Sequence, residues 1–363
     1  MRLIIEITYI LLATLLAALL IPSEQQAEYA TEPTPYVIEE PQIDSDTVRL
    51  VFGGDFMQHM PQVRAAKQSD GSYDYTTSTR YIAPLFRSAD IAVINLETTL
   101  SSTGRYSGYP CFESPAAIAD AFVDMGIDIA LLANNHCCDR WGRGIDSTIV
   151  HLQRRNIAHT GAFRDSTDRA QNSTLYLKSK DIRFALINYT YGTNGIPVPK
   201  GKYVNIIDTI AIKQELKSIC DSVDCVIACM HWGNEYERKQ NIEQRRLAAL
   251  LRREGVDIII GSHPHVIQPF CTDSSHVVFY SLGNFVSNQR SRYSDGGILA
   301  DIEVIRCDTI EGLRYRAKAH PIWVLYPEYK VLPRSVADTL QMSDTERKQY
   351  ECFISDTEAL LRQ

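Results

Sequence analysis

Short apolar runs alternate with amphipathic stretches along the chain from about residue 47 onward. Each apolar run has the length of a buried β-strand. The predicted strands are Val48–Phe52, Ile91–Ile94, Ile127–Leu132, Phe184–Ile187, Cys225–Met230, Val256–Ile260 and Val277–Tyr280. Helical periodicity is clearest in Ile145–Arg155 and Ile242–Glu254. This alternation predicts an α/β fold in which helices cover sheets.

Polar clusters follow almost every predicted strand. Asp55 follows the first strand, Glu97 the second, Asn135 and His136 the third, His231 the fifth, and His263 and His265 the sixth. Ligands of open α/β sheets collect at the carboxyl ends of the strands, so we expect these side chains to converge. Carboxylate, amide and imidazole groups together form a set of metal ligands.

Each cluster also has a structural interpretation when it is taken alone. Asp55 could cap a helix or turn, Glu97 could be a solvated carboxylate, and His231 could be a core histidine. The pair His263 and His265 is different, because the intervening proline fixes the backbone between two imidazoles. The number of clusters at strand ends therefore favours a metal site.

Length and charge limit the class of protein. A chain of 363 residues with 45% hydrophobic and 22% charged residues can bury one large core. The formal net charge is -7, and Lys and Arg do not cluster. Nucleic acid is therefore excluded as the expected partner, because binding to its phosphate backbone requires clustered positive charge.

The N-terminus has the charged, apolar, polar order of an export signal. Arg2 precedes the apolar stretch Ile7–Ile21, and the polar run Ser23–Gln26 follows. The apolar length lies between that of a signal peptide and that of a bilayer span, so a cleaved signal and a membrane anchor both remain open, and we favour cleavage. We expect an exported protein of the periplasm or cell envelope.

Composition divides the chain into four parts. Residues 1–27 are interpreted as the signal peptide or membrane anchor, and residues 28–46 as an extended linker because they are rich in Pro, Glu and Thr. Residues 47–330 form the predicted folded domain. Residues 331–363 are predicted to form a C-terminal helical tail, with a helical pattern around Ala337–Leu361.

The nine cysteines do not have the spacing of a disulfide scaffold. Cys225 and Cys229 lie in an apolar run, where buried thiols are expected. Cys137 and Cys138 follow His136 and could be soft metal ligands, but structural thiols are the favoured interpretation.

Six motifs taken together resemble a known family. They are Gly53–Met57, Ile94–Glu97, Ala133–His136 with Asp139 and Gly142, His231–Tyr236, Gly261–Gln268 and Tyr280–Phe285. Their content and order are similar to those of the CapA family of capsule or poly-gamma-glutamate synthesis proteins. The resemblance extends from about Val48 to Phe285.

This resemblance implies a calcineurin-like metallophosphoesterase fold, a four-layer α/β/β/α sandwich with two mixed sheets. It implies that one or two divalent ions, Mn, Zn or Fe, are bound by a set of six side chains. These are Asp55, Glu97, Asn135, His231, His263 and His265. His136 matches the histidine that protonates the leaving group, and Asp139 would orient it.

Two positions depart from the superfamily pattern. Met57 stands where a second histidine ligand is usual, and Glu97 replaces an aspartate. Loss of a ligand would leave one metal rather than two. His59 could lean over the same site as an additional metal or site residue if a helix begins there.

The candidate substrate-binding residues are Arg105, Arg140, Arg143, Arg238 and Asn284. Arginine can hold an anionic group with two hydrogen bonds, although surface solvation is the alternative for each. We expect a metal-dependent, phosphoesterase-type hydrolase that acts on an anionic polymer or a phosphoester in capsule or poly-gamma-glutamate biosynthesis or export.

Two alternatives remain open. The protein could be a non-catalytic component of capsule export that binds polymer or membrane-bound capsule synthesis proteins, because fold does not fix function. It could also hydrolyse amide bonds of a polyglutamate chain with the same activated water.

Overall fold

The computed structural model divides the chain into Met1–Ile43 and the folded unit Asp44–Gln363. It describes residues 45–273, 275–307 and 312–362. The predicted signal or anchor and most of the predicted linker lie outside these residues. None of the described helices is both long enough and apolar enough to cross a membrane.

The first sheet is mixed and has the order β18-β17-β16-β1-β2-β5-β6, with β15 paired to β1. Its strands are β1 (Ser45–Phe56), β2 (Ile91–Leu96), β5 (Ile129–Leu131), β6 (Ala158–Thr160), β15 (Asn284–Val286), β16 (Gly296–Cys307), β17 (Leu313–Leu325) and β18 (Lys330–Pro333). β1, β2, β5 and β6 run parallel, whereas β16, β17 and β18 form antiparallel pairs. The parallel strands therefore end on the same side of the sheet.

The second sheet is also mixed and has the order β13-β14-β12-β11-β9-β8. Its strands are β8 (Thr174–Ser179), β9 (Ile182–Thr190), β11 (Cys225–His231), β12 (Ile258–Ser262), β13 (Phe270–Thr272) and β14 (Val277–Phe279). The four central strands are parallel, and β8 and β13 pair antiparallel at the edges. Two small two-stranded sheets are formed by β3 (Thr99–Ser101) with β4 (Glu113–Pro115) and by β7 (Ala162–Phe163) with β10 (Tyr203–Val204).

Alternating side chains of β1 enter two different cores. Leu50 and Phe52 belong to a cluster that also contains Phe184 and Ile227 of the second sheet, so the two sheets pack face to face. Val51 points the other way, into a cluster with residues of the covering helices. Both faces of β1 are buried over Leu50–Phe52, which explains why these three residues are all apolar.

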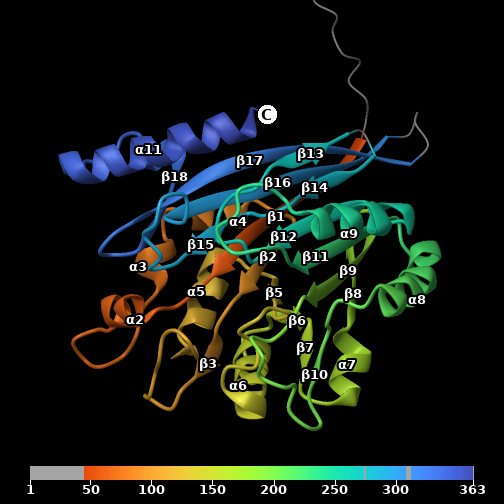
Figure 1. Ribbon diagram of the computed structural model, residues 1–363, viewed down its shortest axis with the longest axis horizontal. Helices are drawn as coiled ribbons and strands as arrows, with labels where there is room; N and C mark the ends of the chain where they lie inside the picture. The colour runs from red at the N-terminus through yellow and green to blue at the C-terminus, as the bar shows by residue number, and fades with distance from the viewer. Residues whose placement is uncertain (1–44, 274, 308–311, 363) are drawn as a thin grey trace, which may run out of the picture. The chain divides into compact units, whose positions relative to one another are not determined.

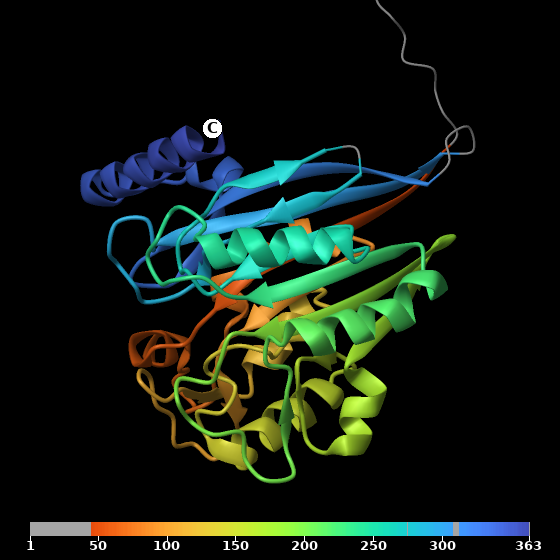
Figure 2. The same cartoon turned by 45° about the vertical axis from the view of Figure 1, so that its right-hand side comes forward.

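Helices cover the outer face of each sheet. The first sheet is covered by α4 (Ala83–Arg87), α5 (Ile118–Met125) and α6 (Trp141–Gln153), and the second by α8 (Thr209–Ile219) and α9 (Ile242–Arg253). In Figure 2, α8 and α9 lie beside β9 and β11. The remaining helices are α2 (Met60–Ala66), α3 (Thr76–Thr79), α7 (Ser166–Asn172), α10 (Arg334–Ala337), α11 (Asp344–Leu361) and the 3-10 turn η1 (Cys220–Ser222). The predicted four-layer arrangement with two mixed sheets is confirmed.

The C-terminal segment continues the first sheet. The predicted boundary after residue 330 falls inside β18, which pairs with β17. Helix α11 lies along β17 and β18 (Figure 1), and the rings of Tyr350 and Trp323 have centroids 5.6 Å apart. Phe353 is also buried.

The cysteines whose side chains the structure describes are all free. Cys225 and Cys229 are buried, as expected from their apolar run. Cys137 and Cys138 are buried in the core under the helices of the first sheet.

Candidate metal centre

Six side chains from five strand ends meet between the two sheets. Asp55 lies on β1, Glu97 follows β2, Asn135 follows β5, His231 ends β11, and His263 and His265 follow β12. All six are at most 3% exposed. The structure thus brings together the complete predicted ligand set.

Carboxylates and imidazoles lie within reach of a shared ion. His265 Nδ1 is 3.1 Å from Asp55 Oδ2, and its Nε2 is 3.9 Å from Glu97 Oε1. His231 Nε2 is 3.7 Å from the same Glu97 oxygen. Two groups have ligand atoms that all lie within 4.8 Å of one another: Glu97, His263 and His265 form one, and Asp55, Glu97 and His231 the other.

Two buried ligand atoms have no hydrogen-bond partner: Glu97 Oε1 and His263 Nδ1. Burial raises the pKa of Glu97 well above its usual value, and the neighbouring Asp55 raises it further. Burial lowers the pKa of His263 to about 3 and that of His231 well below its usual value. An unpartnered buried polar atom costs about 1–3 kcal/mol, and a divalent cation would satisfy both atoms. The residues therefore fit a bound metal.

Hydrogen bonds hold the candidate ligands in place. His231 lies between Ser262 Oγ, 3.0 Å from its Nδ1, and Asn135 Oδ1, 2.9 Å from its Nε2. Asn95 donates from Nδ2 to Asp55 Oδ1 at 2.8 Å. Such contacts fix ring and carboxylate orientation around a metal.

Asn95 and Ser262 lie in the motifs found in the sequence but were given no role there, and Asn194 was not singled out. Asn194, in the segment after β9, accepts a 3.2 Å hydrogen bond from Asn135 Nδ2. Asn95 could have been found, because its register partner on β1 is Asp55. No signal in the sequence near Asn194 connects it with Asn135.

His136 is oriented by Asp139 beside the metal centre. His136 Nδ1 lies 2.8 Å from Asp139 Oδ2, and the Phe112 backbone N–H donates to the same oxygen at 2.6 Å. The edge of the Phe112 ring also contacts His136, with centroids 4.6 Å apart. Because Nδ1 is held by a carboxylate, Nε2 is the atom available for proton transfer, and it lies 3.5 Å from Asn194 Nδ2.

His59 is the N-cap residue of α2, so a helix does begin where the prediction that His59 leans over the metal site required one. Its Nδ1 is 3.3 Å from Gln62 Oε1 and accepts from the Asn288 N–H at 3.4 Å, and its ring packs on Phe112. Burial lowers the pKa of His59 to about 4. His59 belongs to neither group of candidate ligands found among the described residues. Met57 is buried.

The predicted substrate-binding arginines lie outside the ligand cluster. Arg140 and Arg143 both pair with Glu113, at 3.0 and 2.9 Å. Arg238 lies over the Tyr293 ring, 4.2 Å from its centroid. Arg105 is exposed on the loop between β3 and β4.

Asn284 lies close to the candidate metal centre. It is the register partner of Asp55 in the pairing of β15 with β1. Its Nδ2 donates to the Ser294 carbonyl at 2.7 Å. Its Oδ1 is buried and unpartnered. Cys137 and Cys138 are in neither candidate ligand group of the described chain, and their sulfur atoms contact each other at 3.9 Å.

Comparison with known proteins gives a family match over most of the folded unit. Residues 49–289 match the family described as bacterial capsule synthesis protein PGA_cap. The PGA biosynthesis protein CapA of Bacillus subtilis is 28% identical over 67% of this chain and 64% of its own length. The capsule biosynthesis protein CapA of Bacillus anthracis is 25% identical over 68% of this chain and 61% of its own length. The match thus spans less than two thirds of either relative.

The fold also resembles that of a solved structure. A proposed 5′-nucleotidase from Staphylococcus aureus, crystallised with alpha-ketoglutarate, aligns with a TM-score of 0.50 at 14% identity. The alignment covers 85% of this chain and 58% of that one, and it concerns the fold alone. With the family match over residues 49–289, these comparisons establish that the chain belongs to the PGA_cap family of bacterial capsule synthesis proteins and has a metallophosphoesterase-like fold.

Proposed function

We propose that this protein is an exported, metal-dependent, phosphoesterase-type hydrolase that acts in capsule or poly-gamma-glutamate biosynthesis. The observation that carries the proposal is the buried cluster of two carboxylates and three imidazoles in which Glu97 Oε1 and His263 Nδ1 lack partners. Burial of such groups is costly unless an ion compensates for it. Family membership supports a role in capsule synthesis.

Asp55, Glu97, His231, His263 and His265 would hold the ion, with Asn135 offering its side-chain oxygen. Imidazole nitrogen together with carboxylate oxygen suits Mn, Zn or Fe. The two candidate ligand groups share Glu97, an arrangement that accommodates one ion or two. A bound divalent ion would supply a nucleophilic hydroxide at neutral pH and would polarise the phosphoryl oxygen.

His136 would protonate the leaving oxygen. Asp139 holds Nδ1, so in the protonated imidazole Nε2 carries the proton that can be transferred. Asp139 accepts hydrogen bonds from the His136 ring and from the Phe112 backbone N–H, and these contacts restrain the orientation of the His136 ring. The same contacts would keep His136 beside Asn135, where we propose that it acts as the general acid.

The substrate class is proposed from the relatives. One is named a PGA biosynthesis protein and the other a capsule biosynthesis protein, so an anionic polymer or a phosphoester intermediate is the proposed substrate. Membrane-bound capsule synthesis proteins are proposed partners. Export is proposed from the N-terminal pattern, and alkaline phosphatase fused after Asp46 should be active; an inactive fusion at normal expression would reject export.

The hydrolase is tested by metal analysis and turnover measured on the same purified protein. Metal-loaded protein should hydrolyse bis-p-nitrophenyl phosphate, and a His263→Ala variant should not. His276→Ala is a matched control, since His276 is partly exposed, pairs with Asp273 and belongs to neither candidate ligand group. Bound metal without turnover of a phosphodiester would contradict the proposal.

A non-catalytic role in polymer export is the second candidate. Met57, buried at the position where the superfamily usually has a histidine ligand, favours it. Such a protein would bind metal and polymer but hydrolyse neither a phosphodiester nor a gamma-glutamyl polymer. Turnover of the gamma-glutamyl polymer alone would instead indicate amide hydrolysis.

A further inference from the structure

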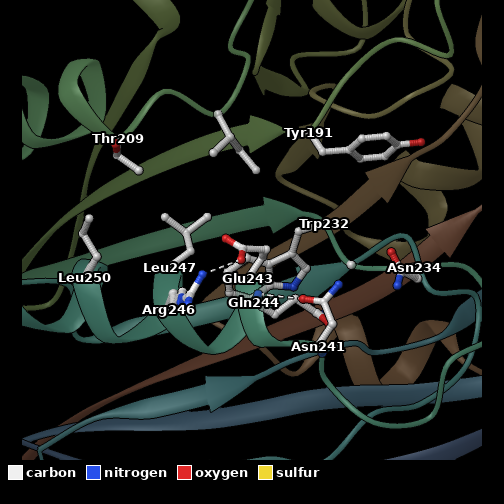
Figure 3. Close-up of a pocket in the computed structure, with 12 residues that line it drawn as sticks. Tyr191, Thr209, Trp232, Asn234, Asn241, Glu243, Gln244, Arg246, Leu247 and Leu250 are labelled. Atoms are coloured by element: carbon white, nitrogen blue, oxygen red, sulfur yellow. Dashed lines mark hydrogen bonds and ion pairs between the residues drawn. The ribbon is translucent and has the colours of Figure 1, made fainter.

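A pocket of about 450 Å³ lies on the outer side of the second sheet, beside helix α9. Apolar side chains form much of its wall: Tyr191, Ile207, Trp232, Leu247 and Leu250. In Figure 3, Leu250 and Thr209 lie at one end of the view, and Tyr191 and Asn234 lie at the other. The pocket is thus elongated and mainly hydrocarbon-lined.

Four polar residues of the pocket, Asn241, Glu243, Gln244 and Arg246, already make hydrogen bonds or ion pairs. Glu243 and Arg246 form an ion pair of 2.9 Å, marked by a dashed line in Figure 3. Asn241 caps α9 through the backbone N–H of Gln244, and Gln244 donates to Gln268 at 2.8 Å. A charged group placed against these four side chains would have to compete with these contacts. The lining therefore favours an uncharged, apolar ligand group.

One pocket residue contacts a candidate ligand of the metal centre. Tyr191 lines the pocket, and its ring centroid is 4.5 Å from that of His263. Trp232 lines the pocket from the outer face of the second sheet, opposite to the face toward which the preceding candidate ligand His231 points. A single molecule could therefore place one end at the metal centre and the other between α9 and the segment before α8.

Apolar residues next to the pocket wall are exposed. Ile210 is 70% exposed and Ile242 is 52% exposed, and each is adjacent in sequence to a pocket residue. Tyr191 itself is 45% exposed. Apolar surface is therefore exposed at Tyr191 and at two sequence neighbours of pocket residues.

We propose that this pocket binds the hydrocarbon chain of an amphiphilic phosphoester whose phosphate lies at the metal centre. The inference rests on the proposed function, because the metal centre must bind the phosphate. Tyr191 would separate the two parts of the ligand. The substrate class is therefore a phosphate ester of a long aliphatic alcohol rather than a short, fully polar ester.

Calorimetric titration with two phosphonates tests the pocket separately from catalysis. Full-length, metal-loaded protein is titrated with methylphosphonate and with decylphosphonate below its micelle concentration. Both carry the same head group and neither is hydrolysed. Each fully buried methylene group contributes roughly fourfold in affinity, so decylphosphonate should bind at least about tenfold more tightly even if only part of its chain is buried.

A pocket variant and a helix-matched control show where the chain binds. Leu250→Asp places a charge in the apolar wall and should remove most of the gain in affinity from methyl- to decylphosphonate. Ala249→Asp adds the same charge at the exposed neighbouring position of α9, and this variant should still bind decylphosphonate more tightly than methylphosphonate. Leu247→Ser is a second pocket variant that should act in the same direction if Leu250→Asp does not fold.

The outcomes separate this inference from the proposed function. Equal affinity for the two phosphonates, or no binding of either, overturns the pocket assignment. If methylphosphonate binding requires metal and the chain adds nothing, the pocket assignment fails while the metal centre stands. If decylphosphonate binds equally well after chelation, the pocket stands but the phosphate is not held by the metal centre.

Discussion

The Nε2 atom of His231 lies 2.9 Å from the side-chain oxygen of Asn135, although 96 positions separate the two residues. His231 ends a strand of the second sheet, and Asn135 follows a strand of the first. The contact therefore joins the two sheets at the candidate metal centre. Groups that bind an ion from both sheets should couple metal binding to the stability of the whole fold.

Removing the metal should lower the melting temperature. A ligand at one hundred times its dissociation constant stabilises the native state by about 2.7 kcal/mol. For a folded unit of this size that corresponds to roughly 4 °C. The measurement is thermal unfolding of protein before and after chelation, with metal content checked in both. An unchanged melting curve in verified metal-free protein would show that the cluster does not bind metal.

Glu97→Gln should raise the stability of the metal-free protein and lower that of the metal-loaded protein. Burial and the neighbouring Asp55 raise the pKa of Glu97, so its charged form is unfavourable without an ion. Without metal, the neutral amide should stabilise the fold by roughly 1–2 kcal/mol. With metal, the variant should bind the ion more weakly and melt lower than wild type. Differential scanning calorimetry of both forms checks this.

The exposed Glu237→Gln is the control for this experiment, because Glu237 lies on the surface. It should leave both melting temperatures unchanged. A Glu97→Gln variant that is destabilised to the same extent with and without metal would argue for a purely structural Glu97.

Most of the parallel strands could be predicted from the sequence because they are buried on both faces, although the short parallel strands β6 and β15 were not predicted. β11 was predicted as Cys225–Met230 and spans Cys225–His231. The long antiparallel strands β16 and β17 were not predicted. In β17, apolar residues alternate with polar ones from Leu313 to His320, and only the end of the strand, Ile322–Leu325, is a continuous apolar run. Burial of one face only gives a weaker sequence signal.

The candidate ligands could be predicted because each directly ends or follows a strand. The groups around them could not, since tertiary packing alone brings them there. Asn194 reaches Asn135 from a loop after β9, and Phe112 reaches His136 from the end of a loop before β4. Conversely, Arg140 was predicted to bind substrate from its position near His136, but it pairs with Glu113, which the sequence alone does not place beside it.

Asp301→Asn should remove part of the acid sensitivity of the fold. Burial would raise the pKa of Asp301, but hydrogen bonds from Arg49 and His320 outweigh it and hold the pKa well below its usual range. A lowered carboxyl pKa in the folded state adds stability that is complete above the unfolded value of about 4 and is lost as the pH falls through the folded value. The free energy of unfolding of the wild type should therefore exceed that of the variant most at pH 7.

We expect a difference of about 1 kcal/mol at pH 7, because Arg49 is partly exposed and solvent screens the pair. The difference should shrink as the pH falls below 4. Urea unfolding at pH 7 and at successively lower pH checks this, with the exposed Asp181→Asn as the control. A difference that does not depend on pH would mean that packing, rather than charge, accounts for the role of Asp301.

His136→Ala should keep the metal but lose activity. His136 is held by Asp139 rather than by a candidate ligand, so its removal leaves the coordinating groups in place. Loss of a general acid costs on the order of 10² to 10⁴ in rate. His265→Ala, in contrast, should lose metal and activity together, because His265 contacts Asp55 in the ligand cluster. Metal analysis of both variants separates the two roles.

The rate defect of His136→Ala should also depend on the leaving group. A nitrophenolate leaves without being protonated, whereas an alkoxide needs a proton, so the defect should grow as the pKa of the leaving group rises. The measurement is kcat/KM for a series of phosphodiesters with wild type and variant. Asp139→Asn should show the same trend with a smaller defect, because it disturbs the orientation of His136 and leaves the imidazole in place. A defect of equal size for all leaving groups would show that His136 positions the substrate and does not transfer the proton.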